Sequence, residues 1–213
     1  MIPGTYPARK PEFTVAVGSR TPWGRADSAR RKGPGIFEVS TPSHGGYKLD
    51  VTRNAKIPRA LRRKGGWYEE DIDWAIVVLF LGHTFDFCTP DAFEDARSCV
   101  RGSFPDEYEA IFGVKVTPEQ SHVLRQRAAK AAVKGKLQSV ACWGDWSRNV
   151  PPGFVGVCAR IDGRDGPAET EAYFVLSEAE YEASHIPELH SHLVPENAQR
   201  VASVDGECPF GPK

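Results

Sequence analysis

The sequence predicts an α+β fold in which small mixed or antiparallel sheets pack with several short helices and one longer helix. Strand-like and helix-like segments follow one another without the regular alternation that builds a parallel α/β sheet. Within residues 36–52, two segments of alternating apolar and polar residues are joined by a loop rich in turn-forming residues. Within residues 154–176, two strand-like segments are joined by a loop rich in glycine and aspartate. We therefore expect one N-terminal and one C-terminal hairpin.

The elements around the first hairpin follow from proline, glycine and charge. Residues 1–12 read as an irregular arm, and residues 13–17 as a short strand. Residues 30–35 read as a loop because basic residues run into Gly-Pro-Gly. Pro58 suits the first position of a short basic helix that Gly65-Gly66 would end.

Residues 68–81 are ambiguous between a helix and a buried strand. The acids at the start favour a helix, because negative charge stabilises a helix N-terminus. The β-branched run that follows is equally typical of a buried strand. We favour the helix, and expect further short helices over residues 90–101 and 105–112.

Two capping boxes predict where later helices begin. The first, at residues 117–120, has a proline at the first helical position and opens the longer helix, expected over residues 118–134. The second, at residues 177–180, opens a short helix that ends near residue 183. A further strand is expected over residues 140–146.

Length and composition indicate one globular domain over residues 13–185, followed by a surface-wrapping or flexible tail over residues 186–213. The longest apolar run, residues 74–81, is too short to span a bilayer, so we expect no membrane partner. The five cysteines are widely spaced and form no C-x-x-C pair. These features predict a cytoplasmic protein, and they leave its oligomeric state open.

Charge is strongly segregated along the chain although the net charge is only −1. Residues 1–66 carry 14 Lys or Arg against 4 Asp or Glu, whereas residues 67–113 carry 2 against 11. Such blocks either pair internally or form a basic face for nucleic acid or a host protein complex. The patch that we expect in the second case consists of Arg30, Arg31, Lys32, Arg59, Arg62, Arg63 and Lys64.

The first candidate site is the turn Thr41-Pro42-Ser43-His44-Gly45-Gly46 between the two strands of the N-terminal hairpin. An imidazole acts as an acid, a base or a ligand near neutral pH, and amides beside glycines can approach an anionic group closely. We therefore expect His44 to be catalytic, and Ser43, Gly45 and Gly46 to bind the ligand. The alternative is a turn histidine packed on its own hairpin.

The second candidate is the segment Trp67-Tyr68-Glu69-Glu70-Asp71. Clustered carboxylates suit a general acid or a hard divalent cation. They equally suit a helix start that pairs with basic blocks. We assign Glu69, Glu70 and Asp71 a catalytic role beside His44, and expect Trp67 and Tyr68 to stack on a base or sugar.

The residue spacings match no established metal or cofactor motif. The H-x-H pair of His190 and His192 has no second matching pair, and phosphate-binding and dinucleotide-binding glycine motifs are missing. We therefore assign no metal ligand and no cofactor from the sequence.

The motif Ser40-Thr41-Pro42-Ser43-His44-Gly45-Gly46 and the segment from Gly66 to Ala75 resemble those of an uncharacterised bacterial domain-of-unknown-function family. The likeness covers most of the chain. Members are typically encoded on plasmids, integrated elements and phages of proteobacteria, which implies an accessory role in a mobile element, such as counter-defence. The resemblance implies no particular reaction.

Three functions remain open from the sequence. The first is a site where His44 and the acidic cluster act on a nucleotide or nucleic-acid-like ligand. The second is a non-catalytic binding protein, either an inhibitor of a host defence complex or a nucleic-acid-binding factor. The third is a structural component of a phage particle.

Overall fold

The computed structural model describes residues 13–85, 88–204 and 206–212, and the expected arm over residues 1–12 lies outside these ranges. The fold is α+β, as the sequence predicts. Contacts divide the chain into two compact units, Met1–Ser121 and His122–Lys213. The single globular domain expected over residues 13–185, followed by a tail, stays a prediction.

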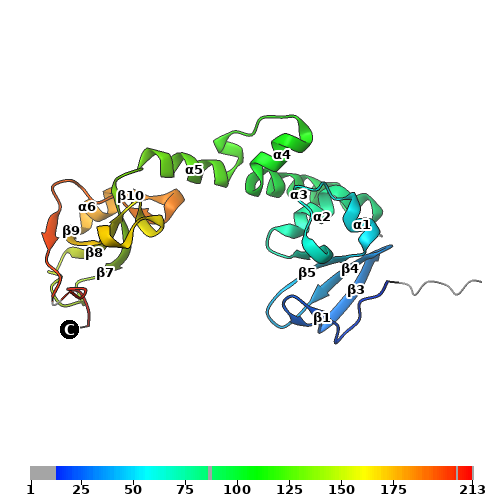
Figure 1. Ribbon diagram of the computed structural model, residues 1–213, viewed down its shortest axis with the longest axis horizontal. Coiled ribbons are helices and arrows are strands. Elements are labelled where there is room, and N and C mark those ends of the chain that lie inside the picture. The colour runs from blue at the N-terminus through cyan, green and yellow to red at the C-terminus, as the bar shows by residue number, and fades with distance from the viewer. Residues whose placement is uncertain (1–12, 86–87, 205, 213) are drawn as a thin grey trace, which may run out of the picture. The chain divides into compact units, whose positions relative to one another are not determined.

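The N-terminal unit is built on a four-stranded antiparallel sheet in the order β3-β4-β5-β6 (Figure 1). A small two-stranded sheet, β1 with β2, precedes it. The predicted hairpin is confirmed as the central pair β4–β5. The six strands are β1 (Arg20–Thr21), β2 (Gly24–Arg25), β3 (Ser28–Gly33), β4 (Ile36–Ser40), β5 (Gly45–Leu49) and β6 (Trp67–Glu69).

Helices of the same unit pack against this sheet and against one another. Helix α2 contacts β5, β6 and helix α3, and most of its residues are buried, which explains why its sequence is apolar all round. The helices are α1 (Val51–Lys56), α2 (Asp73–Leu81), α3 (Pro90–Ser103) and α4 (Pro105–Phe112), with short 3₁₀ turns η1 (Lys64–Gly66), η2 (Gly82–Thr84) and η3 (Pro118–Gln120). Helices α3 and α4 confirm the short helices that the sequence predicts.

Three local predictions in this unit were wrong. Residues 13–17 form no strand, although Phe13 packs on Phe37 with ring centroids 5.7 Å apart. Residues 28–33 form β3 instead of a loop, since the chain reverses only at Pro34-Gly35, where Gly35 has φ +74°. Pro58 starts no helix.

The helix near that proline lies just before it. Asp50 caps α1 by accepting a hydrogen bond from the Arg53 amide at 2.6 Å. Ile57, the residue before the proline, is extended with ψ 133°, so the helix ends there. The favoured helix is confirmed for the β-branched run, which lies in α2, so the strand alternative for that run was wrong. The helix starts later than expected, at Asp73, because residues 67–69 pair with β5 as strand β6.

The expected longer helix over residues 118–134 is present but interrupted. The predicted capping box at Thr117 and Gln120 is confirmed, yet it closes only the turn η3. Ser121 is extended, with φ −140°, and its hydroxyl donates to the Gly102 carbonyl at 2.8 Å. Helix α5 (His122–Ala132) then starts afresh.

The C-terminal unit has a second antiparallel sheet in the order β12-β9-β8-β7, which contains the predicted hairpin β8–β9 (Figure 1). Helix α6 (Glu178–Ala183) starts at the predicted capping box. The strands are β7 (Leu137–Trp143), β8 (Phe154–Ile161), β9 (Ala172–Ser177), β10 (His185–Ile186), β11 (Ser191–His192) and β12 (Gln199–Val201), with turns η4 (Gly163–Asp165), η5 (Ala168–Thr170) and η6 (Pro187–Leu189).

Both faces of this second sheet are covered. Val157, Phe174 and Leu176 belong to one buried cluster, and Val175 packs with Phe210 in another. Phe210 is 4% exposed, so the end of the described chain contributes to the core of this unit.

Candidate functional site

The turn that carries His44 is locked by its own hydrogen bonds. The Thr41 amide and hydroxyl both donate to the His44 carbonyl, at 2.7 and 2.8 Å, and the His44 amide donates to the Thr41 hydroxyl at 3.1 Å. Thr41 is buried, whereas the His44 side chain is 52% exposed. The backbone is therefore fixed while the imidazole remains accessible. Ser43 is exposed beside it.

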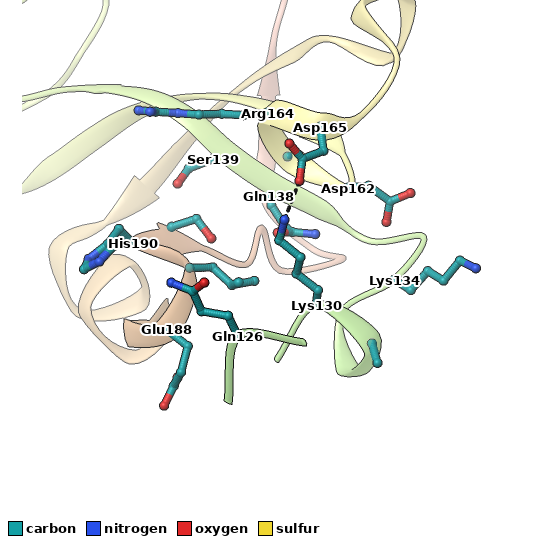
Figure 2. A pocket seen from close by; sticks show the side chains of 14 residues that line it. Gln126, Lys130, Lys134, Gln138, Ser139, Asp162, Arg164, Asp165, Glu188 and His190 are labelled. Carbon is teal, nitrogen blue, oxygen red and sulfur yellow. Dashed lines mark hydrogen bonds and ion pairs between the residues drawn. The ribbon is translucent and has the colours of Figure 1, made fainter. Parts of the chain in front are cut away.

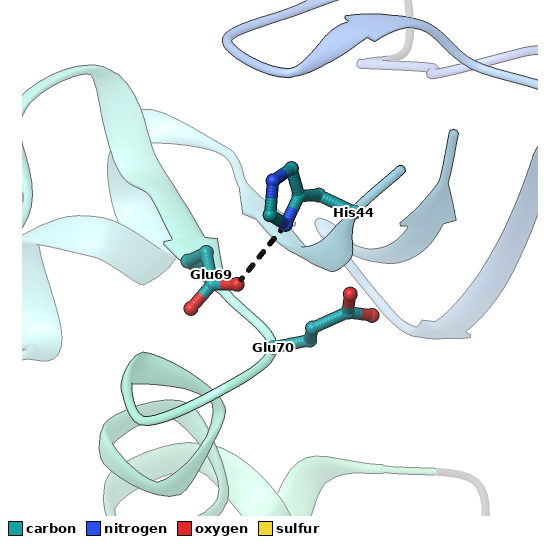
Figure 3. Close-up of side chains that lie close together, drawn as sticks. All are labelled: His44, Glu69 and Glu70. Carbon is teal, nitrogen blue, oxygen red and sulfur yellow. Dashed lines mark ion pairs between the residues drawn. The ribbon is translucent and has the colours of Figure 1, made fainter. Parts of the chain in front are cut away.

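Strand pairing brings the acidic segment to this turn. Gly46 of β5 pairs with Glu69 of β6, and the Glu70 amide donates to the Gly45 carbonyl at 3.0 Å. As a result His44 Nδ1 lies 3.8 Å from Glu69 Oε1 (Figure 3). The two sequence motifs meet in space, as the sequence predicts.

The two carboxylate oxygens of Glu69 differ in their hydrogen bonding. Its Oε2 accepts a hydrogen bond from the Asp71 amide at 2.8 Å. Its Oε1 is buried and has no hydrogen-bond partner among the described residues, although His44 stands beside it. A buried carboxylate oxygen without a partner costs free energy, and its retention in a fold points to a function.

Glu70 completes a cluster of three. One donor atom from each of His44, Glu69 and Glu70 lies within 4.8 Å of the others. Figure 3 shows the three side chains gathered where the turn meets the segment after β6. The remaining acids have other positions: Asp71 is exposed and contributes its amide, while Asp73 pairs with Arg63.

The two glycines make this packing feasible, but they do not form the anion-binding turn that the sequence suggested. Both are buried within β5. A Cβ at Gly45 would overlap Glu70 Oε2, and one at Gly46 would overlap the Tyr68 carbonyl and lie 2.8 Å from the Trp23 ring. Their role is to let Glu70 and the neighbouring strand approach closely.

The aromatic residues of the segment have different roles. Trp67 is half-buried, meets Trp23 edge-on with ring centroids 5.7 Å apart, and lies 4.8 Å from the Lys48 ammonium. Tyr68 is fully buried, and its hydroxyl donates to Asn54 Oδ1 at 2.7 Å. Tyr68 therefore has no surface left for a ligand, contrary to the prediction for it.

A cavity of about 370 Å³ adjoins the cluster, because Glu70 also lines it. Its other walls include Arg30, Glu38, Tyr47 and Trp74. Burial, helped by the negative charge of Glu38, raises the pKa of Tyr47 to about 12, so its phenol stays protonated near neutral pH. The cavity thus offers a hydrogen-bond donor and an aromatic wall beside the cluster.

Comparison with protein families adds one finding. The model of the domain of unknown function DUF7007 matches residues 16–134, more than half of the chain. The chain belongs to the DUF7007 family. No curated protein and no solved structure matches the chain significantly. All three residues of the cluster lie within the DUF7007 region, and so does the adjoining cavity.

The basic residues of the DUF7007 region do not form one free patch. Arg30 and Lys32 lie 3.4 and 3.9 Å from Glu38, and Arg62 donates to the Ile57 carbonyl. Arg63 makes a bidentate pair with Asp73 at 2.6 and 2.8 Å, which raises the pKa of Arg63. Exposed side chains belong to Arg30, Arg31, Arg59, Arg62 and Lys64.

A second cavity, of about 510 Å³, lies in the C-terminal unit and was not predicted (Figure 2). Helix α5, within the DUF7007 region, forms one wall, and later segments form the others. Lys130 donates to Asp165 at 2.6 Å, while Lys134 and Arg164 extend away from this pair in Figure 2. Its charges therefore do not converge on one point, and we assign it no ligand.

Within the described part of the chain, no helix has both the length and the apolar character needed to cross a membrane.

Proposed function

We propose that this DUF7007 protein is an accessory protein of a mobile genetic element, with counter-defence as one such role. In this proposal its N-terminal unit holds a chemical site, centred on His44 and Glu69, that acts on a nucleotide or nucleic-acid-like ligand. The mobile-element context rests on the likeness of the motifs around His44 and Trp67.

The observation that carries the chemical part is the contact between His44 and Glu69. An accessible imidazole stands 3.8 Å from a buried carboxylate oxygen that has no other partner in the described residues. Carboxylates in this position orient an imidazole, both when it transfers protons and when it serves as a ligand. A turn histidine packed only for stability needs no such neighbour.

The surroundings support a ligand with aromatic and phosphate groups. Trp67 of β6 and Trp23, in the turn between β1 and β2, present half-buried indoles that meet edge-on, and aromatic faces stack on bases whatever the sequence. Lys48 adds a cation beside Trp67, and burial lowers its pKa. Arg30 lines the same cavity as Glu70.

The test compares paired substitutions in the full chain. His44→Ala and Glu69→Gln remove the imidazole and the carboxylate charge, and His83→Ala and Glu94→Gln make the same changes at exposed positions elsewhere in the unit. Each protein is incubated with nucleotides, single-stranded DNA and RNA, and products are separated by chromatography. We expect the first pair to lose activity by about 100-fold or more, as removal of an acid–base group does.

Equal activity in all four variants would refute the role of the pair. If the wild type forms no product, and the variants bind every ligand as the wild type does, the result would favour the non-catalytic alternative. For that alternative the exposed Arg31, Arg59 and Lys64 supply the contacts, and charge reversal at these positions should weaken nucleic-acid binding in a salt-dependent way.

A further inference from the structure

The geometry points to a divalent transition-metal ion, of the Zn²⁺ or Mn²⁺ class, bound by His44, Glu69 and Glu70. This inference rests on the proposed function, because it names the cofactor of the same site. It departs from the sequence-based expectation of no metal ligand, which considered only established ligand spacings.

The donors come from two segments that the sheet holds together. His44 lies in the turn before β5, and the two glutamates lie at and just after the end of β6. The three donor atoms already lie within 4.8 Å of one another. Metal–ligand bonds of about 2.1 Å require donor separations of roughly 3 to 3.5 Å, so a shift of about 1 Å closes the set. His44 and Glu70 are exposed and free to make it.

The state of Glu69 is the second observation. Its Oε2 is fixed by the Asp71 amide, and this bond orients the carboxylate as outer hydrogen bonds orient metal ligands. Its Oε1 is buried without a hydrogen-bond partner among the described residues, on the side that faces His44. A cation between them gives this oxygen the partner that the protein does not.

The close approach of Glu70 is the third observation. A Cβ at Gly45 would overlap Glu70 Oε2, so the strand has a glycine where this carboxylate lies against it. Two carboxylates beside each other repel one another, and they also repel a phosphate. A divalent cation reverses both effects, since it neutralises the glutamates and attracts the phosphate oxygens.

The donor types define the class of ion. One imidazole and two carboxylates suit zinc, manganese and iron, whereas calcium prefers six to eight oxygen ligands. Three protein donors leave coordination positions open for water or substrate, as in catalytic sites rather than in structural ones. The adjoining cavity, which Glu70 also lines, gives a ligand access to those positions.

The experiment measures binding of the metal alone to the full chain. Mn²⁺ is titrated while the imidazole signals of the six histidines are followed by NMR, and the spectrum of His44→Ala assigns the signal of His44. We expect Mn²⁺ to broaden the His44 signal first. In equilibrium dialysis we expect Glu69→Gln and Glu70→Gln to bind Mn²⁺ at least about tenfold more weakly than the wild type. His83→Ala and Glu94→Gln should bind like the wild type.

Zn²⁺ needs one further control, because the rings of His185 and His192 lie 4.9 Å apart and offer a competing site. Zn²⁺ is therefore titrated calorimetrically in a His192→Gln background, where the His44 cluster should bind one ion. Glu70 is exposed, so Glu70→Gln leaves the core intact and remains informative if Glu69→Gln is unstable.

The inference is overturned if Mn²⁺ broadens other histidines and spares His44, or if both glutamate variants bind as the wild type does. These results are separate from the proposed function. Metal binding without turnover of any nucleotide or nucleic acid would leave the inference standing and refute the proposed function. Turnover that survives complete removal of metal by EDTA would leave the proposed function standing and refute the metal as its cofactor.

Discussion

Replacing Gly45 by alanine should weaken the cluster without removing any of its donors. The new Cβ would overlap Glu70 Oε2 and lie 3.3 Å from Glu70 Cδ. Both atoms belong to a flexible, exposed side chain, so Glu70 moves and the strand stays. Restoring ordinary van der Waals separation displaces the carboxylate by about 1 Å.

This displacement adds to the shift of about 1 Å that the donors already need to close on an ion, because the new methyl group occupies space that Glu70 now uses. Metal ligation tolerates errors of only a few tenths of an ångström, so we expect Mn²⁺ affinity to fall by about tenfold to 100-fold. The fold should survive. Gly45 has no positive φ, and alanine in a strand gains about 0.5–1 kcal/mol over glycine in backbone entropy. That gain offsets the tight contact, 3.1 Å, between the new Cβ and the Val39 carbonyl.

The assay is equilibrium dialysis of Mn²⁺ with thermal unfolding of the same samples. In a Glu70→Ala background the Gly45→Ala change should cost no further affinity, because the atom that it displaces is gone. An equal loss in both backgrounds would refute the reasoning. Gly46→Ala is the contrasting variant: its Cβ overlaps the Tyr68 backbone carbonyl and Gly46 has φ +152°, so it should unfold the unit.

Three further predictions concern stability. Tyr68→Phe leaves Asn54 Oδ1 and the Arg63 amide without their phenol partner and should cost about 1–3 kcal/mol in urea unfolding; a change near zero would contradict this. Burial, and then nearby His185, lower the pKa of His192. The imidazole of His192 therefore binds a proton more readily in the unfolded chain than in the folded unit. Stability should therefore fall as pH drops through about 6.5, and His192→Phe should flatten the slope measured by thermal unfolding. Calorimetry should resolve two transitions, one for each compact unit, whereas a single one would support one domain over residues 13–185.

Much of the fold could be predicted because its signals are local. Alternating side chains identified β4, strand-like segments on either side of a glycine-rich and aspartate-rich loop identified β8 and β9, and the capping boxes identified η3 and α6. Helix α1 was missed because its signal is a single cap, Asp50, within a stretch that also alternates. The basic run of β3 has the composition of a loop, and pairing with β4 makes it a strand.

The site could be predicted only in part, for a related reason. The meeting of His44 with the acidic segment follows from a hairpin whose next partner is β6. Which acids take part depends on where the strand ends. Glu69 and Glu70 lie at that end, but Asp73 falls on α2, where Arg63 holds it in a bidentate pair. No spacing rule separates these roles, because the change from strand to helix occurs within a few residues.

The ion pair between Arg63 and Asp73 bears on which function the N-terminal unit serves. Segregated charge in the sequence suggested a basic face for nucleic acid, but part of that charge stabilises the fold. Arg63 binds Asp73, Arg62 binds backbone carbonyls, and Arg30 lies beside Glu38. A guanidinium engaged in this way has fewer donors left for phosphate. The cluster around Glu69 has the opposite character, since it retains a buried acceptor that has no hydrogen-bond partner in the described chain. A buried acceptor without a hydrogen bond needs an explanation that an internally paired cation does not, and this asymmetry favours chemistry at the cluster over binding by the patch.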